Sequence, residues 1–185
     1  MKKIAIFGST GSIGTSLLNI VKKDKKNFKI ELISANKSYK KLIKQATFFN
    51  VKNLIITDQN SFLKAKKILK NRNINVYNNF DSFKKIFNNK KIDYTMSAIS
   101  GFEGLKPTLD VIKFTKVIAI ANKESIICGW CLIKKNLKKF NTKFIPVDSE
   151  HFSIWSLIKD KKNNNLEKVY LTASGGPFRK YPLKL

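Results

Sequence analysis

The stretch KIAIFGSTGSIG, residues 3–14, decides the fold. Its first five residues are mostly apolar and typical of a buried strand, and glycines follow at positions 8, 11 and 14. A strand that runs through a glycine-rich turn into a helix can hold a dinucleotide, because backbone N–H groups at the helix N-terminus face the diphosphate. The spacing is GxxGxxG rather than GxGxxG, so the strand and helix context carries the prediction, with a plain βα turn as the alternative.

Outward from this stretch, short β-like runs alternate with longer amphipathic runs, the pattern of a parallel sheet covered by helices. We predict strands at residues 3–7, 29–34, 53–57, 76–77, 94–98, 117–121 and 143–147. We predict helices at residues 13–22, 40–50, 61–70, 82–87, 105–114 and 124–140. The fold class is therefore α/β, a Rossmann-like doubly wound parallel sheet over residues 1–147.

The remaining residues, 148–185, are expected to begin a second domain of α+β type. A helix is predicted at 152–158, followed by the polar loop KDKKNNNLEK and a strand from Val169 that runs into the glycine turn SGG. A lone strand cannot satisfy its backbone groups. We therefore expect a complete first domain followed by the opening, apparently truncated, of a catalytic domain.

Composition predicts a folded protein, since 43% of the 185 residues are hydrophobic and 11% are aromatic. No apolar run approaches the roughly 20 residues that cross a bilayer, and glycine interrupts the N-terminal run too early for a signal peptide. We expect a cytoplasmic protein with no membrane partner.

The net charge of +25, from 37 basic and 12 acidic residues, raises the question of a nucleic-acid partner. Only Arg72 and Arg179 are arginines, although arginine is favoured for gripping phosphates and bases. The lysines are scattered among many asparagines and isoleucines. An AT-rich coding bias explains this composition, with the lysines on solvated faces. We therefore expect no nucleic-acid partner, while the positive field would help to attract a phosphorylated substrate.

The end of the second predicted strand bears on which dinucleotide binds. NAD sites carry an acidic residue there, whereas NADP sites carry neutral or basic residues. Here the strand runs into Ala35, Asn36, Lys37 and Ser38, without a carboxylate. An ordinary polar loop would look the same, but together with the glycine turn this segment favours NADP.

Two carboxylates, Asp148 and Glu150, follow the last predicted strand, at the edge where open α/β sheets bind ligands. Such hard oxygen ligands suit Mg²⁺ or Mn²⁺. Helix capping by Asp148, with Glu150 in the first turn, explains the same residues equally well. The only histidine, His151, is a metal ligand, an acid–base group or, most commonly for a lone histidine, a residue of the first helical turn.

Cys128 and Cys131 have the CxxC spacing of a redox or zinc pair. Zinc would need about four ligands, and a redox pair would need its first cysteine at a helix N-terminus. Both cysteines instead lie inside the predicted helix 124–140, on its apolar face. We predict buried core thiols with no redox or metal role.

Four segments together carry a family resemblance: GSTGSIG at 8–14, ANKES at 121–125, PVDSEH at 146–151 and SGGPFR at 174–179. In this order and spacing the chain resembles the 1-deoxy-D-xylulose 5-phosphate reductoisomerases of the non-mevalonate isoprenoid pathway. The resemblance implies an NADPH- and divalent-metal-dependent homodimeric oxidoreductase. Such an enzyme rearranges its ketose phosphate to an aldehyde and reduces it to 2-C-methyl-D-erythritol 4-phosphate.

The same resemblance implies roles for individual residues. Cofactor-binding residues would be Thr10, Gly11, Ser12, Ile13, Asn36, Lys37, Ser38, Asn122 and Glu124. Catalytic residues would be Lys123, Asp148 and Glu150, of which the two carboxylates bind the metal. Substrate would contact Lys123, Ser149, Glu150 and Ser174. The metal, Mg²⁺ or Mn²⁺ with Co²⁺ as a further option, would hold substrate oxygens and polarise the carbonyl group.

Two departures from the family pattern bear on activity. Asn36 stands where the family often has glycine, which would change how closely the backbone approaches the 2′-phosphate without removing Lys37. The sequence also stops at Leu185, before the family's substrate-covering flap, further phosphate-binding residues, third carboxylate ligand and C-terminal helical domain. For this segment alone we expect NADPH binding with weak or absent turnover.

Three alternatives compete with this interpretation. The first is a generic NADP-dependent reductase that needs no metal, and the second is a stand-alone NADPH-binding module. The third is a basic protein that binds nucleic acid electrostatically, with a steep salt dependence.

Overall fold

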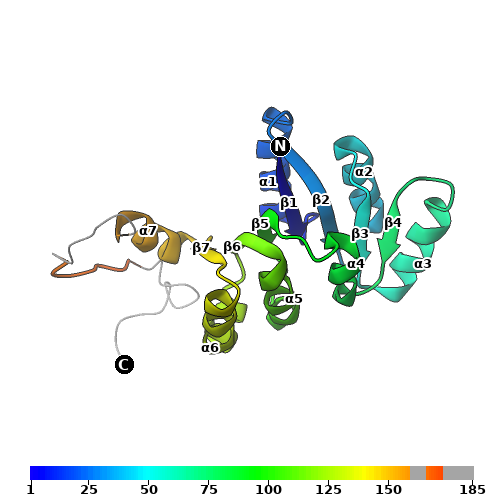
Figure 1. The fold of residues 1–185 in the computed structure, drawn as a ribbon. Helices are drawn as coiled ribbons and strands as arrows, with labels where there is room; N and C mark the ends of the chain where they lie inside the picture. Colours follow the sequence, from blue (N-terminus) through cyan, green and yellow to red (C-terminus); the bar gives the residue numbers. More distant parts are fainter. Residues whose placement is uncertain (159–165, 173–185) are drawn as a thin grey trace, which may run out of the picture. The chain divides into compact units, whose positions relative to one another are not determined.

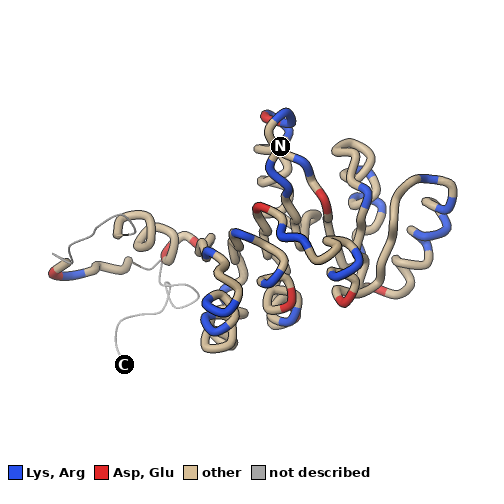
Figure 2. Tube along the Cα trace, in the orientation of Figure 1, with Lys and Arg blue, Asp and Glu red and all other residues tan. Residues whose placement is uncertain are grey.

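The computed structural model describes residues 1–158 and 166–172 (Figure 1). The chain divides into two compact units, Met1–Asp148 and Ser149–Leu185, which are described separately. In the described part of the chain, no helix combines the length and apolar character that crossing a bilayer requires. Figure 2 shows Lys and Arg spread along many elements of the first unit rather than gathered on one of them.

The first unit is built on a seven-stranded sheet in the order β4-β3-β2-β1-β5-β6-β7, with every neighbouring pair parallel. The strands are β1 (Lys2–Phe7), β2 (Phe28–Ala35), β3 (Asn53–Ile56), β4 (Asn75–Tyr77), β5 (Ile92–Ser97), β6 (Thr115–Ile120) and β7 (Lys143–Pro146). The chain moves outward from β1 to β4 and then returns to β5 on the other side of β1. The predicted doubly wound sheet is confirmed, with its switch point between β1 and β5.

Helices cover both faces of this sheet. They are α1 (Ser12–Lys23), α2 (Tyr39–Phe49), α3 (Gln59–Ile68), α4 (Phe83–Phe87), α5 (Leu105–Val111) and α6 (Lys123–Lys139). Short 3₁₀ turns are η1 (Phe80–Ser82), η2 (Phe102–Gly104) and η3 (Ile112–Phe114). The segment predicted as one helix at 105–114 is thus α5 followed by η3.

Strand β1 shows why two layers of helices are needed. Side chains alternate along a strand, and Ile4 and Ile6 lie in a buried cluster with residues of α1, α2 and α3. Ala5 and Phe7 lie in a second buried cluster with residues of α4, α5 and α6. A strand buried on both faces reads as a continuous apolar run, as KIAIF does.

The prediction of buried cysteines is wrong. Cys128 and Cys131 are free and exposed, while Ser125, Gly129 and Ile133 form the buried stripe of α6. Gly129 lies against the side chain of Leu105, so the glycine allows the close approach of the two helices. Helix α6 carries apolar residues on more than one face. The face with Gly129 packs inward, because the glycine lets α5 come closer than a larger side chain would.

The second unit contains α7 (Ser149–Ile158), which begins three residues before the predicted start at 152. Residues 166–172 have no regular secondary structure, so the strand predicted from Val169 is wrong over its described part. No described strand pairs with that segment, and an unpaired strand leaves its backbone groups without partners. The SGGPFR motif at 174–179, including Ser174, lies outside the described residues.

Candidate functional site

A cleft of about 760 Å³ lies at the carboxyl ends of strands β1 to β5. Its lining residues are Gly8, Thr10, Gly11, Ser34, Ala35, Asn36, Thr57, Asn78, Asn79, Phe80, Asp81, Ala98, Ile99, Ser100, Glu103, Lys106 and Pro107. The cleft therefore spans the switch point of the sheet, where open α/β folds bind their ligands. Thr10, Gly11 and Asn36 are the predicted cofactor residues that line it.

The three glycines of the turn differ in what requires them. Gly8 has φ +73°, and a Cβ there would lie 2.5 Å from the carbonyl oxygen of Ala98 in the segment after β5. A Cβ at Gly14 would lie 2.5 Å from the carbonyl oxygen of Gly8. At Gly11 the nearest such atom is the same carbonyl oxygen at 3.4 Å, an ordinary contact. The fold needs Gly8 and Gly14, whereas Gly11 faces the cleft.

The N-terminus of α1 is suited to an anion. Its N-cap is Gly11, which has no side chain to cap the first N–H groups, and its first turn has no acidic residue. By contrast, Asp58 caps α3 and Asn122 caps α6 through their side chains. A helix N-terminus left open in this way binds phosphate through backbone N–H groups and the helix dipole. Two further predicted cofactor residues, Ser12 and Ile13, form this first turn.

Helix α2 holds the glycine turn in place, a feature that the sequence did not reveal. The Ser9 hydroxyl donates to Gln45 Oε1 at 2.8 Å, and Gln45 Nε2 donates back to the Ser9 carbonyl oxygen at 3.0 Å. Lys41 Nζ donates to the Thr10 carbonyl oxygen at 2.7 Å. The four-residue spacing of Lys41 and Gln45 places them on one helix face, but no local pattern identifies the turn as that face's partner.

The loop after β2 carries the residues expected at the adenosine phosphate. Lys37 and Ser38 are exposed, and the Lys37 carbonyl oxygen accepts from Ser61 Oγ at 3.2 Å. Hydrogen bonds from Ser61 lower the pKa of Asp58 below its usual value, and the charge of Lys37 contributes to this shift. The absence of a carboxylate at 35–38, together with the Lys37 ammonium, suits a phosphate rather than a ribose hydroxyl.

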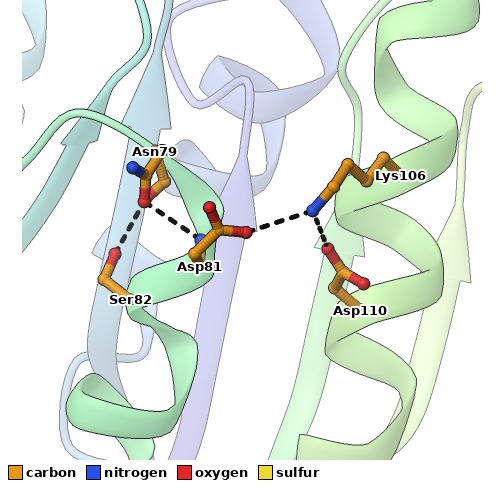
Figure 3. A network of polar contacts seen from close by, with 5 residues as sticks. All are labelled: Asn79, Asp81, Ser82, Lys106 and Asp110. Carbon is orange, nitrogen blue, oxygen red and sulfur yellow. Dashed lines mark hydrogen bonds and ion pairs between the residues drawn. The ribbon is translucent and has the colours of Figure 1, made fainter.

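An ion-pair network lies on the rim of the cleft (Figure 3). Lys106 of α5 is 3.1 Å from Asp81 of η1 and 2.7 Å from Asp110 one turn along its own helix. Hydrogen bonds to Asp110 and Asp81 raise the pKa of Lys106. Because these side chains are exposed, the pairs add little stability. Their effect is on the local charge: Lys106 offsets the negative charge of Asp81, which would otherwise repel an anionic ligand in the cleft.

Asn122 is buried, and all of its side-chain amide is used within the protein. It accepts from Ser125 N at 2.8 Å, and it donates to the carbonyl oxygens of Ile99 and Gly101. Its side chain therefore fixes the segment after β5 that lines the cleft. The neighbouring predicted residues Lys123 and Glu124 are exposed in the first turn of α6.

Asn122→Asp is expected to lower the free energy of unfolding by about 1–3 kcal/mol, even though it keeps the N-cap acceptor. The carboxylate would oppose the carbonyl oxygens that the amide now serves. Chemical denaturation would measure the change. As a control, Asn136→Asp alters an exposed amide that donates only to the Leu132 carbonyl oxygen of its own helix. Equal stability of both variants would contradict this role.

The predicted metal ligands lie at the boundary of the two units. Asp148 is the last residue of the first unit, and Glu150 lies in the first turn of α7 in the second. Ser149 Oγ donates to Glu150 Oε2 at 2.7 Å. Among the described residues there is no group of three or more His, Cys, Asp or Glu side chains that could enclose a metal.

Residues 4–129 match the family model of 1-deoxy-D-xylulose 5-phosphate reductoisomerase, and residues 144–185 match the model of that enzyme's C-terminal domain. The chain belongs to the 1-deoxy-D-xylulose 5-phosphate reductoisomerase family. The resemblance inferred from the four segments is thereby confirmed.

Relatives within this family match the chain along its length. It is 73% identical over 185 residues to the reductoisomerase of Pelagibacter ubique (strain HTCC1062), covering 100% of this chain and 48% of that protein. It is 42% identical over 181 residues to the reductoisomerase of Clostridium kluyveri, covering 97% of this chain and 47% of that protein. The chain thus spans about half the length of the curated reductoisomerases that it matches.

Solved reductoisomerase structures share the fold. The enzyme from Zymomonas mobilis in complex with NADPH superposes with a TM-score of 0.88 at 31% identity, covering 98% of this chain and 48% of that one. A reductoisomerase structure with fosmidomycin and magnesium gives a TM-score of 0.87 at 26% identity, covering 99% of this chain and 48% of that one.

Proposed function

We propose that the chain is the NADPH-binding half, with the first metal ligands, of a 1-deoxy-D-xylulose 5-phosphate reductoisomerase. The enzyme would convert 1-deoxy-D-xylulose 5-phosphate to 2-C-methyl-D-erythritol 4-phosphate and oxidise NADPH. The observation that carries this proposal is the cleft at the switch point of the sheet, with an open helix N-terminus at the glycine turn. The Zymomonas mobilis relative, solved with NADPH, supports it.

The residues around the cleft fit NADPH. Backbone N–H groups of Ser12 and Ile13 would bind the diphosphate, and Gly11 leaves room for it. Thr10 and the segment Asn36–Ser38 would bind the adenosine part. Glu124 and the Asn122 backbone would lie toward the nicotinamide end, beyond β5. When bound, NADPH would supply the hydride, and the chain would orient it at the sheet edge.

The donor set at Asp148 and Glu150 fits a hard divalent cation, Mg²⁺, Mn²⁺ or Co²⁺. A bound metal would polarise the carbonyl group of the substrate. Lys123, Ser149 and Ser174 would contact the substrate, a phosphorylated ketose, and the lysine charge would attract its phosphate. A homodimer and a cytoplasmic location complete the proposal, and sedimentation analysis and cell fractionation would test them.

Asp148→Asn and Glu150→Gln are each expected to weaken Mn²⁺ binding by about tenfold or more, because each removes a charged oxygen ligand. Electron paramagnetic resonance of free Mn²⁺ would measure the affinity without any need for turnover. Glu167→Gln, an exposed carboxylate of the second unit, serves as the control and should leave Mn²⁺ binding unchanged. Unchanged Mn²⁺ binding in the Asp148 and Glu150 variants would contradict the metal site. Metal-independent NADPH oxidation would favour a generic reductase.

A further inference from the structure

We infer that Lys41 is a ligand of the NADPH 2′-phosphate and so a determinant of the preference for NADPH over NADH. This inference rests on the proposed function and adds to it a residue from helix α2, outside the loop expected to carry this role. The structural basis is the position of the Lys41 ammonium at the glycine turn. Its Nζ donates to the Thr10 carbonyl oxygen at 2.7 Å and to Thr15 Oγ1 at 3.2 Å.

The charge of Lys41 is not balanced by a carboxylate. Both of its acceptors are neutral, and none of the ion pairs found among the described residues includes it. Lys106, which lines the cleft, is by contrast paired with Asp81 and Asp110. An ammonium has three protons, and two of those on Lys41 are used. Its third proton and its full charge are therefore available to an anion.

The place of this ammonium matches the ribose end of the cofactor. Lys41 lies in the first turn of α2, directly after the loop Asn36–Ser38 at the end of β2. In dinucleotide-binding folds the ribose 2′ position lies at the end of this strand. The partner of Lys41, Thr10, lines the cleft in the glycine turn. Lys41 thus comes from the helix that follows the β2 loop and brings its ammonium to the glycine turn, where we expect the 2′-phosphate.

Two further observations support a phosphate at this position. The N-cap of α2, Ser38, makes no side-chain capping hydrogen bond, and the first turn of α2 has no acidic residue. The Lys37 carbonyl oxygen accepts from Ser61 Oγ of α3 at 3.2 Å, so Lys37 lies on the α3 side of the loop. Lys41 would hold the opposite side of the same phosphate.

A purely structural role for Lys41 is the main alternative. However, Gln45 already joins α2 to the turn through two hydrogen bonds with Ser9. Removing the Lys41 charge would therefore leave the turn held. The two roles also differ in what they predict for NADH, which lacks the 2′-phosphate but has the same diphosphate.

The test compares the wild-type chain with Lys41→Met, Lys41→Arg and the control Lys44→Met by calorimetric titration. Lys44 lies on the same helix and is exposed, and its side chain has no hydrogen bond or ion pair to another described residue. The ligands are NADPH, NADH, and the pair adenosine 2′,5′-bisphosphate and adenosine 5′-monophosphate, which differ only in the 2′-phosphate. Thermal unfolding of each variant reports whether the fold is intact.

Lys41→Met is expected to weaken NADPH and the bisphosphate about tenfold or more, as expected for a lost charge-assisted contact. Its affinities for NADH and the monophosphate should change less than about twofold, and Lys41→Arg should retain most of the NADPH affinity. Equal weakening of NADPH and NADH would overturn the inference in favour of a diphosphate or structural role. Unchanged NADPH binding in Lys41→Met would also overturn it. Failure of the wild-type chain to bind NADPH would instead overturn the proposed function.

Discussion

Gly8→Ala is expected to lower the free energy of unfolding by about 2–5 kcal/mol. Its φ of +73° is in the left-handed region, where an alanine costs about 1–2 kcal/mol. The new Cβ would also lie 2.5 Å from the carbonyl oxygen and 2.9 Å from the carbonyl carbon of Ala98, both backbone atoms. Strand β1 pairs directly with β5, so relieving this overlap would strain the sheet, at about 1–3 kcal/mol.

The chain provides a matched control for this substitution. Gly101 has nearly the same φ, +74°, but a Cβ there would meet no atom within 4 Å. With ψ −174°, Gly101 lies in a backbone region that is nearly exclusive to glycine, so Gly101→Ala should cost only this conformational part, about 1–3 kcal/mol. Urea denaturation with a common m-value would compare the two variants. If both alanine variants lost the same stability, the contact between the turn and Ala98 would not be what requires Gly8.

Gly11→Ala is expected to weaken NADPH binding about a hundredfold while changing the free energy of unfolding by less than about 1 kcal/mol. Gly11 has φ −74°, which alanine adopts, and its Cβ would only touch the Gly8 carbonyl oxygen at 3.4 Å. That methyl group would, however, stand at the mouth of the α1 N-terminus. Keeping the diphosphate from two N–H groups would cost about 1.5 kcal/mol or more for each.

Binding and stability of the Gly11 variant must be measured together. Fluorescence titration with NADPH gives the affinity, and the denaturation midpoint gives the stability. Tight NADPH binding by a folded Gly11→Ala chain would mean that the diphosphate does not lie at this turn. A large loss of stability would show instead that Gly11 has a structural role that its open surroundings do not reveal.

The fold could be predicted because its signals are local. In KIAIF both sets of alternating side chains are apolar, which indicates a strand covered on two faces. Each of the seven strands is a short apolar run next to an amphipathic one, so each could be located within one or two residues. The strand expected from Val169 had the same composition, but strand formation depends on a partner, which composition does not reveal.

The site could be predicted only in part, because it depends on contacts between distant residues. The bonds from Lys41 and Gln45 to the glycine turn join residues 31 and 36 positions apart, and neither lysine nor glutamine has a sequence pattern that marks such a contact. Likewise, the resemblance predicts Asn122 near the cofactor, but it did not reveal that the Asn122 amide holds the segment after β5 through the carbonyl oxygens of Ile99 and Gly101. Which face of α6 turns inward could not be predicted either, because it is set by the close packing of Gly129 against Leu105 of α5.

The most direct test of the central claim is a calorimetric titration of the wild-type chain with NADPH and, separately, with NADH. A cleft with an open α1 N-terminus and no carboxylate at residues 35–38 predicts saturable one-to-one binding of NADPH, at least about tenfold tighter than that of NADH. Absence of NADPH binding, or equal affinity for the two dinucleotides, would contradict the account.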